Sequence, residues 1–204
     1  MGTITDKLNH IINTKEGIRQ EINRAYETEE ISNSDTFNSY IQKLEEHPFY
    51  LKRLVEGTIE SIKVSNVTSI GSNAFRFCSG LTSVSIPNAT SIGNYAFYGC
   101  TGLTSVSFPN ATSIGSQAFY SCSNLTSVSF PEATNIGDSA FYNCSGLTTI
   151  YVGTNTSTVC TLSNTNAFNK CTKLTNIYVP ASLVSKYKSA TNWSNYASKI
   201  KVAP

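Results

Sequence analysis

The segment SIGSNAFRFCSGLTSVSIPNAT occupies residues 69–90, and three further segments of the same length and pattern follow it without interruption. They are SIGNYAFYGCTGLTSVSFPNAT (91–112), SIGSQAFYSCSNLTSVSFPEAT (113–134) and NIGDSAFYNCSGLTTIYVGTNT (135–156). A half unit (59–68) precedes them, and a fifth unit, AFNKCTKLTNIYVP (167–180), follows after five extra residues. A repeat of 22 residues predicts a solenoid, in which each unit buries its apolar side chains only by stacking on its neighbours.

Every repeat contains the spacing L-x-x-L-x-L, seen first as Leu81, Val84 and Ile86. This spacing predicts a short strand with one buried face, and alternation with period two directs the other side chains outward. We define these outward positions as the strand face and take them as the first candidate binding surface. They are Ser83, Ser85, Ser105, Ser107, Ser127, Ser129, Thr149, Tyr151, Asn176 and Tyr178. The strand face is neutral and rich in hydroxyl groups, and it becomes aromatic toward its C-terminal end.

An Ala-Phe pair recurs before each strand, and we expect it to lie on a short helical turn with the phenylalanine in the core. A glycine, first Gly71, recurs before the pair, where a tight bend would need unrestricted backbone angles. Tyr98, Tyr120 and Tyr142 follow the pair in three repeats and should stack in register. We name them the tyrosine stripe, a second candidate surface for a sugar or a protein. The alternative for both surfaces is a neutral solvated exterior, in which the tyrosines only shield the turn.

The full pattern I-G-x-x-A-F-x-x-C-x-x-L-x-x-V-x-x-P resembles the BspA-like leucine-rich repeats of bacterial and protist surface proteins, over about residues 59–180. The resemblance implies an α/β fold, namely a right-handed leucine-rich-repeat solenoid with a parallel sheet on one side. It also implies a role in adhesion and protein recognition rather than catalysis. Ala89, Ala111 and Ala133 stand where ordinary leucine-rich repeats place a buried asparagine. Another group must therefore satisfy the turn.

Five of the six cysteines keep one register through the repeats, three residues after the core phenylalanine and three before the core leucine. They are Cys78, Cys100, Cys122, Cys144 and Cys171. This position favours buried free thiols. Neighbouring strands lie roughly 4.7–4.9 Å apart, so distance alone leaves a disulfide open. A metal site is disfavoured, because no C-x-x-C pair or nearby histidine offers ligand spacing. The state of Cys160, outside the register, stays open.

The repeats divide the chain into three predicted parts: an N-terminal helical domain (1–50), the solenoid (51–180) and a C-terminal cap (181–204). Apolar residues over 4–25 follow a heptad pattern interrupted by Lys15. This pattern predicts a helix that either forms a homo-oligomeric coiled coil or docks on the helix that follows it.

Both ends of the chain carry further resemblances. TDKLNHIINTKEGIRQEI and SDTFNSYIQKL, in the N-terminal part, resemble the openings of some tail-associated proteins of bacteriophages and prophages. PASLVSKYKSATNWSNYASKIKV, at the C-terminal end, resembles the helical segment that follows the last repeat in several BspA-like proteins. Such a segment would cover the core of the final coil.

No pattern of a known catalytic site is present, and the two histidines, His10 and His47, lie outside the repeats. We therefore expect no enzyme, no cofactor and no metal. The net charge of +2 is small, and basic residues are not interleaved with aromatics, so we expect no nucleic-acid partner. From Lys170 to Lys201 there are six lysines and no acid, a basic end that either is solvated or approaches an anionic surface.

The first thirty residues lack the apolar core of a secretory signal, and no run of residues is long and apolar enough to span a membrane. We expect synthesis in the cytosol without membrane insertion, and then a place in a virion or at the cell surface by an unidentified route. The sequence thus favours a non-enzymatic protein-interaction or adhesion module that binds a protein or surface glycan of a host or neighbouring cell. Narrower or alternative interpretations are a phage or prophage tail accessory, a cell-surface adhesin fragment, and a structural spacer assembled through its N-terminal helices.

Overall fold

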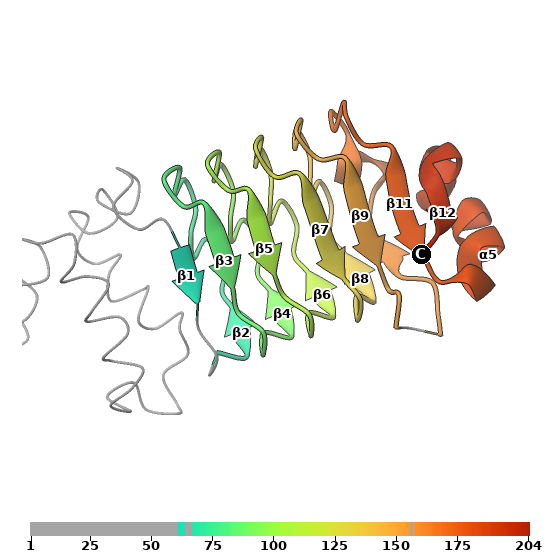
Figure 1. The fold of residues 1–204 in the computed structure, drawn as a ribbon, viewed down its shortest axis with the longest axis horizontal. Coiled ribbons are helices and arrows are strands. Elements are labelled where there is room, and N and C mark those ends of the chain that lie inside the picture. The colour runs from blue at the N-terminus through green and yellow to red at the C-terminus, as the bar shows by residue number, and fades with distance from the viewer. Residues whose placement is uncertain (1–60, 64–66, 156) are drawn as a thin grey trace, which may run out of the picture.

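The computed structural model of the 204-residue chain describes residues 61–63, 67–155 and 157–204. The helices and the coiled coil predicted within residues 1–50 lie outside the described residues. In the described part, successive coils stack along one axis, and strands of neighbouring coils lie side by side (Figure 1). This is the repeat solenoid that the 22-residue period predicts.

The strands predicted from the leucine spacing, joined by one strand from beyond the last repeat, form two parallel sheets on one side of the solenoid. Their strands are β1 (Ser61–Lys63), β3 (Ser83–Ser85) and β5 (Ser105–Ser107) in the first sheet, and β7 (Ser127–Phe130), β9 (Thr149–Val152), β11 (Asn176–Val179) and β12 (Ile200–Val202) in the second. The register follows the repeat, since Val84 pairs with Val106 and Ile150 with Ile177. The repeat spacing therefore also aligns the outward positions of successive strands.

A second ladder of five parallel strands lines another side of each coil and was not expected from the sequence. Its strands are β2 (Ser69–Ile70), β4 (Ser91–Ile92), β6 (Ser113–Ile114), β8 (Asn135–Ile136) and β10 (Thr161–Leu162). Each has two residues, of which the second is buried. Two residues are too few to produce a periodic pattern, so the ladder left no sequence signal.

The core is a stack of like side chains, because each coil places the same residue at the same depth. Phe75, Phe97, Phe119 and Phe141 are buried, with neighbouring ring centroids 5.1–5.2 Å apart, and Phe168 continues the stack at 5.6 Å from Phe141. The predicted core position of these phenylalanines is confirmed. The apolar interior is continuous from the first described coil to the last.

The backbone around the Ala-Phe pair differs from the prediction. A 3-10 helix, η1 (Thr165–Phe168), holds the pair in the fifth repeat only, and in the four earlier repeats the pair lies in consecutive turns. Alternate backbone N–H groups donate to the next coil instead of to their own. Phe75 N donates to Ala96 O of the next coil at 2.7 Å, whereas Ala74 N donates to Gly71 O of its own coil at 3.4 Å. A helix keeps its N–H groups within one segment, so hydrogen bonding between coils excludes it here.

Glycine is required at the recurring position for a different reason from the one expected. Among the described glycines, only Gly99 and Gly153 have a positive φ. The recurring glycines Gly93, Gly115 and Gly137 therefore have negative φ. A Cβ atom at Gly93 would lie 2.5 Å from the carbonyl carbon of Gly71 in the preceding coil. The glycine is therefore required by the close approach of two backbones rather than by its backbone angles.

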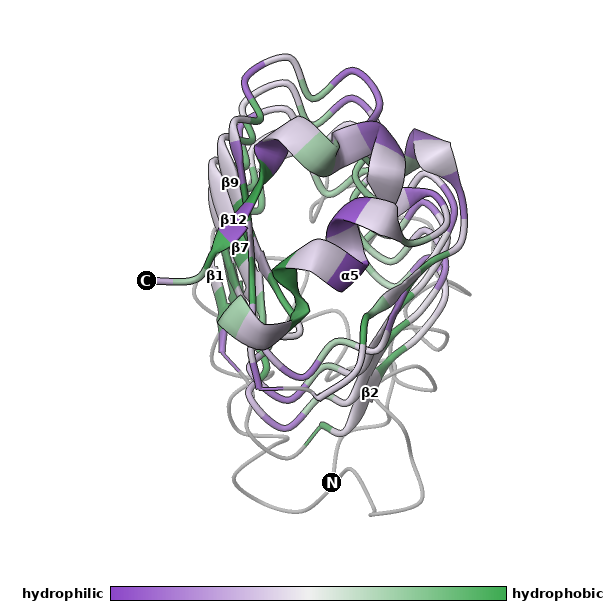
Figure 2. Ribbon diagram, turned by 90° about the vertical axis from the view of Figure 1, so that its right-hand side faces the viewer, coloured by the Kyte–Doolittle hydropathy of each residue, from purple (hydrophilic) through white to green (hydrophobic). Residues whose placement is uncertain are grey.

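The C-terminal segment closes the end of the coil stack, where its helices cross the last coil (Figure 2). It contains η2 (Ala181–Leu183), α5 (Val184–Ser189), η3 (Trp193–Lys199) and then β12. Tyr187 and Trp193 are buried, and both bind the backbone of Cys160: the Tyr187 hydroxyl accepts from its N–H at 2.9 Å, and Trp193 Nε1 donates to its carbonyl at 2.6 Å. The five-residue insertion and this segment thus stabilise each other.

In the part of the chain that the structure describes, no helix has the length and apolar character that crossing a membrane requires.

Candidate binding surfaces

The strand face consists of two rows of side chains in register. Along β7, β9 and β11, Ser129 pairs with Tyr151, and Tyr151 with Tyr178. All ten positions are exposed or half-buried, while the residues between them are buried, apart from the half-buried Val106. The structure therefore brings together, on one side, the strand residues that the sequence singled out.

The C-terminal end of the strand face carries a lysine, Lys201, from beyond the last repeat. β12 pairs in parallel with β11 and sets Lys201 beside Tyr178. Lys201 Nζ donates to Asn176 Oδ1, and Lys199 Nζ donates to Leu174 O. The signal for this strand was available, because KIKV (199–202) repeats the alternation of NIYV (176–179). The C-terminal cap therefore ends in a short strand after its helices.

The tyrosine stripe stacks as predicted. Tyr98 and Tyr120 have ring centroids 4.7 Å apart and planes 8° apart, and Tyr120 and Tyr142 have centroids 4.9 Å apart and planes 10° apart. The guanidinium of Arg76 lies 5.2 Å from the centroid of Tyr98, and Lys170 Nζ lies 5.2 Å from that of Tyr142. A hydrogen bond with Tyr142 also raises the pKa of Lys170. Cations therefore close both ends of the stack, which leaves mainly ring edges and hydroxyl groups for a ligand.

Phe77 extends the aromatic region at the first described coil. Its ring meets Tyr98 edge-on, with centroids 5.4 Å apart, and half of its surface is exposed. The ring lies over Gly99, where an added Cβ would come within 2.6 Å of it. Phe77 itself has φ of 61°, a strained value for this residue type. This cluster packs onto the end of the tyrosine stripe and shields it.

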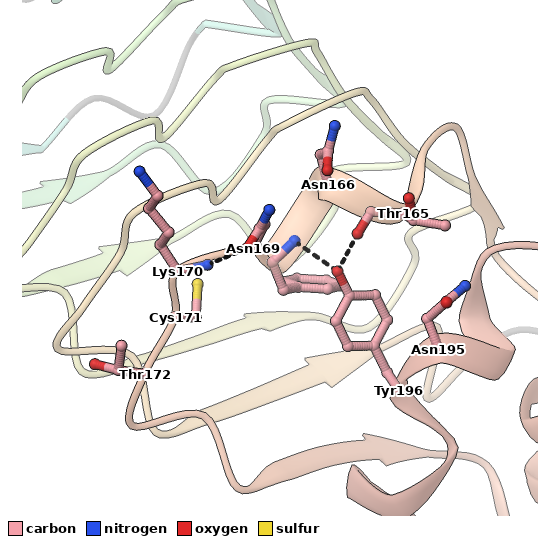
Figure 3. A pocket seen from close by; sticks show the side chains of 9 residues that line it. Thr165, Asn166, Asn169, Lys170, Cys171, Thr172, Asn195 and Tyr196 are labelled. Carbon is pink, nitrogen blue, oxygen red and sulfur yellow. Dashed lines mark hydrogen bonds between the residues drawn. The ribbon is translucent and has the colours of Figure 1, made fainter.

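A shallow pocket of about 430 Å³ lies where the last coil meets η3 (Figure 3). The Tyr196 hydroxyl accepts from Phe168 N at 3.3 Å and donates to Thr165 O. Burial raises the pKa of Tyr196, so the phenol remains a neutral donor at physiological pH. The other lining groups include Asn166, Asn195 and Lys170, with no carboxylate or imidazole among them. The polar groups of the pocket hold the seam together, and no catalytic pair is formed.

The cysteines are free and buried, as predicted for the five in register, and Cys160 is buried as well. Each of four Sγ atoms donates to the carbonyl of the core phenylalanine in the preceding coil, at 2.9–3.1 Å. The donors are Cys100, Cys122, Cys144 and Cys171. Burial raises the pKa of Cys78 and Cys160 to about 12. The thiols are thus buried hydrogen-bond donors at the Ala-Phe turns, and they are poor nucleophiles.

Comparisons with known proteins agree with this geometry. The family described as BspA type leucine rich repeat region matches the chain in six copies, over residues 7–111, 42–163 and 90–202. No curated protein matches the chain significantly.

Three crystal structures of leucine-rich-repeat proteins are similar to the chain. A protein from T. pallidum is 28% identical with a TM-score of 0.51, and the match covers 57% of this chain and 54% of that one. A protein from Bacteroides ovatus is 27% identical with a TM-score of 0.55, covering 71% and 36%. A leucine rich cell surface protein from Faecalibacterium prausnitzii is 27% identical with a TM-score of 0.53, also covering 71% and 36%. The chain thus spans about half the length of the first protein and about a third of the other two.

Proposed function

Because the chain belongs to the BspA-type leucine-rich-repeat family, we propose that it is a non-enzymatic adhesion module that contacts the surface of a host or neighbouring cell through its strand face. The single observation that carries this proposal is the register of the outward side chains. Ser85, Ser107 and the positions that continue their row lie on adjacent strands and point away from the core. A regular, rigid row of this kind presents many weak contacts at once without any cost of ordering a loop.

The composition of the strand face supports recognition rather than chemistry. Its side chains are hydroxyl, amide and phenol groups, which donate and accept hydrogen bonds. Within the described residues, no group of three or more His, Cys, Asp or Glu side chains lies together as a metal site would require. The buried thiols are likewise withdrawn from solvent.

The tyrosine stripe is the weaker candidate, because its ring faces are used internally. Arg76 and Lys170 cover the outer faces of the end rings. Contact with a partner there would rely on ring edges and hydroxyls. On the strand face, by contrast, the outward side chains of β5 and β7 are exposed.

An array of extracellular-matrix proteins, cell-surface proteins and glycans tests the proposal with the full chain. Ser107→Arg and Ser129→Arg each place a bulky cation in the centre of the strand face, and we expect either change to lower binding strongly. Thr101→Arg adds the same side chain at an exposed turn position outside the strands and should leave binding unchanged. Equal binding by all four proteins would show that the strand face is not the contact surface.

Two narrower proposals rest on residues outside the described part of the chain. Self-association through residues 4–25 predicts that Lys15→Ile strengthens an oligomer, because it removes a charge from the heptad seam. Light scattering that finds a monomer at high concentration, with and without the substitution, would refute this. A role as a phage or prophage tail accessory predicts capsid and tail genes beside this gene. Surface-anchoring genes there would favour a cell-surface adhesin instead.

A further inference from the structure

Tyr151 has one ring face on which, among the described residues, neither a second ring nor a cation stacks. Its ring stacks on Tyr178, with centroids 4.9 Å apart and planes 26° apart. Because β9 and β11 are neighbours in register, this stack runs along the direction in which the strands follow one another. The second face of Tyr151 therefore looks toward β7, where its paired residue is Ser129. A serine side chain is too short to cover a phenol ring, so a flat aromatic surface remains open above a row of serines.

This open face distinguishes the stack of Tyr151 and Tyr178 from the tyrosine stripe. In the tyrosine stripe, Arg76 and Lys170 occupy the positions over the terminal rings. Among the described residues, no cation and no second ring takes the corresponding position over Tyr151. The stack on the strand face is thus the one that a planar or ring-shaped ligand can extend.

Polar groups run beside the two tyrosines on the same strands. Lys201 Nζ donates to Asn176 Oδ1 at 2.5 Å, and Asn176 Nδ2 donates to Thr149 Oγ1 at 3.5 Å. This chain of contacts positions the side chains while leaving capacity for a ligand. The ammonium has three donors and spends one here. Ammonium, amide and hydroxyl groups therefore follow one another along the row beside Tyr178 and Tyr151.

The charged side chains that follow Asp138 in the sequence are all lysines. No acidic residue follows Asp138 in the sequence, whereas six lysines lie between residues 170 and 201. Lys201 is held at the strand face by its hydrogen bond to Asn176. The carboxylate of Glu132, two residues after β7, accepts a hydrogen bond from Asn155 Nδ2 at 2.7 Å. An anionic ligand would therefore meet attraction at the Lys201 end of this surface.

These features fit a sugar polymer that carries carboxylates. The C–H face of a pyranose ring packs on an open aromatic face, its hydroxyls match serine, threonine and asparagine, and its carboxylates match lysine. A single-stranded nucleic acid also stacks on tyrosine and needs cations, but it places a phosphate at every nucleotide. The rows from Ser83 to Ser129 carry no positive charge that could follow such a backbone. The neutral, hydroxyl-rich continuation of the surface favours the glycan.

We propose that the C-terminal end of the strand face binds an acidic glycan, with one sugar ring stacked on Tyr151 over Ser129 and carboxylates near Lys201. This proposal rests on the proposed function, since it names the ligand class of that same surface.

The test is an array that carries uronate- and sialate-bearing glycans, their neutral counterparts and single-stranded oligonucleotides, probed with the full chain. We expect acidic glycans to bind above their neutral counterparts. Tyr151→Ala removes the ring, and Ser129→Leu fills the space over it while keeping the tyrosine stack intact. Each should weaken binding by about tenfold or more, the loss expected when one aromatic contact disappears. Ser72→Leu adds the same apolar side chain at an exposed position outside the strands and should bind like the parent chain.

Lys201→Gln should reduce the preference for acidic over neutral glycans, and added salt should do the same, because screening shortens the reach of the ammonium to roughly 3 Å at 1 M. Binding of oligonucleotides alone, or of acidic and neutral glycans alike, would overturn the proposal. So would glycan binding that neither Tyr151→Ala nor Ser129→Leu weakens. One outcome would separate the two proposals. If the chain bound proteins on the array but no acidic glycan, and Ser107→Arg abolished the protein binding, the acidic-glycan site would be refuted while the adhesion role of the strand face stood.

Discussion

The substitution Gly115→Ala separates two explanations of the recurring glycine by the sign of its effect. An ideal Cβ at Gly115 would lie 2.6 Å from Asn94 N and 2.6 Å from the carbonyl carbon of Gly93. Both atoms belong to the backbone of the preceding coil and cannot swing aside. If the glycine only supplied flexibility, alanine would stabilise the fold by about 0.4–1 kcal/mol, because it restricts the unfolded chain.

The close approach predicts the opposite sign. To restore an ordinary contact, the two coils would have to separate by almost 1 Å at this point. That movement stretches two hydrogen bonds, from Gly115 N to Ile92 O at 2.8 Å and from Ser116 N to Asn94 Oδ1 at 2.8 Å. Overpacking of a close-packed interior costs about 1–3 kcal/mol and each weakened hydrogen bond about 0.5–1.5 kcal/mol. We therefore expect Gly115→Ala to lower the free energy of unfolding by roughly 2–4 kcal/mol.

Urea denaturation measures this difference, with circular dichroism reporting on the whole solenoid and the single tryptophan, Trp193, on its C-terminal end. Ser116→Ala is the matched control, because it keeps the Cβ and the backbone N–H and removes only a hydroxyl. It should change the free energy of unfolding by no more than about 0.5 kcal/mol. A Gly115→Ala protein as stable as the parent, or more stable, would refute the close-approach explanation.

Three further predictions concern the cysteines and the C-terminal segment. Dithiothreitol should leave the melting temperature unchanged, and thiol alkylation should be slow until denaturant is added; a reductant-dependent melting temperature would instead reveal a disulfide. The free energy of unfolding should stay at its full value below pH 9 and fall as the pH rises toward 12. Burial in the fold raises the pKa of Cys78 and Cys160 to about 12, so the unfolded chain loses those protons at a lower pH than the folded chain does. Urea midpoints from pH 8 to 11 check this, and a flat profile would contradict it. Trp193→Phe should lower the free energy of unfolding by about 1–3 kcal/mol, since the buried carbonyl of Cys160 loses its donor at 2.6 Å; an unchanged urea midpoint would show that this hydrogen bond contributes nothing.

The repeat alone predicts the strands, their register and the buried phenylalanines, because translation by one repeat places equivalent residues on each other. Ser83 pairs with Ser105 for this reason, and the stacking of Tyr98 on Tyr120 follows in the same way. The strand face was predictable for the same reason, since its residues occupy the alternate positions of each repeat.

Features that depend on contact between coils were not predictable from one repeat. The turns around Ala74 and Phe75 resemble a helix in sequence, yet their N–H groups divide between their own coil and the next. The terminal rings of the tyrosine stripe are covered by the side chains of Arg76 and Lys170. The conformation of these long side chains is not specified by sequence spacing. The place of Lys201 at the strand face depends on β12, a three-residue strand beyond the last repeat.

Hydroxyl-radical footprinting of the full chain, free and bound to a partner found on the array, tests the central claim most directly. Tyrosine side chains react with the radical, and the two candidate surfaces carry different tyrosines. If the strand face is the contact surface, binding should protect Tyr151 and Tyr178 and leave Tyr98, Tyr120 and Tyr142 as reactive as in the free chain. Protection of the three residues of the tyrosine stripe, with Tyr151 and Tyr178 unchanged, would contradict the account.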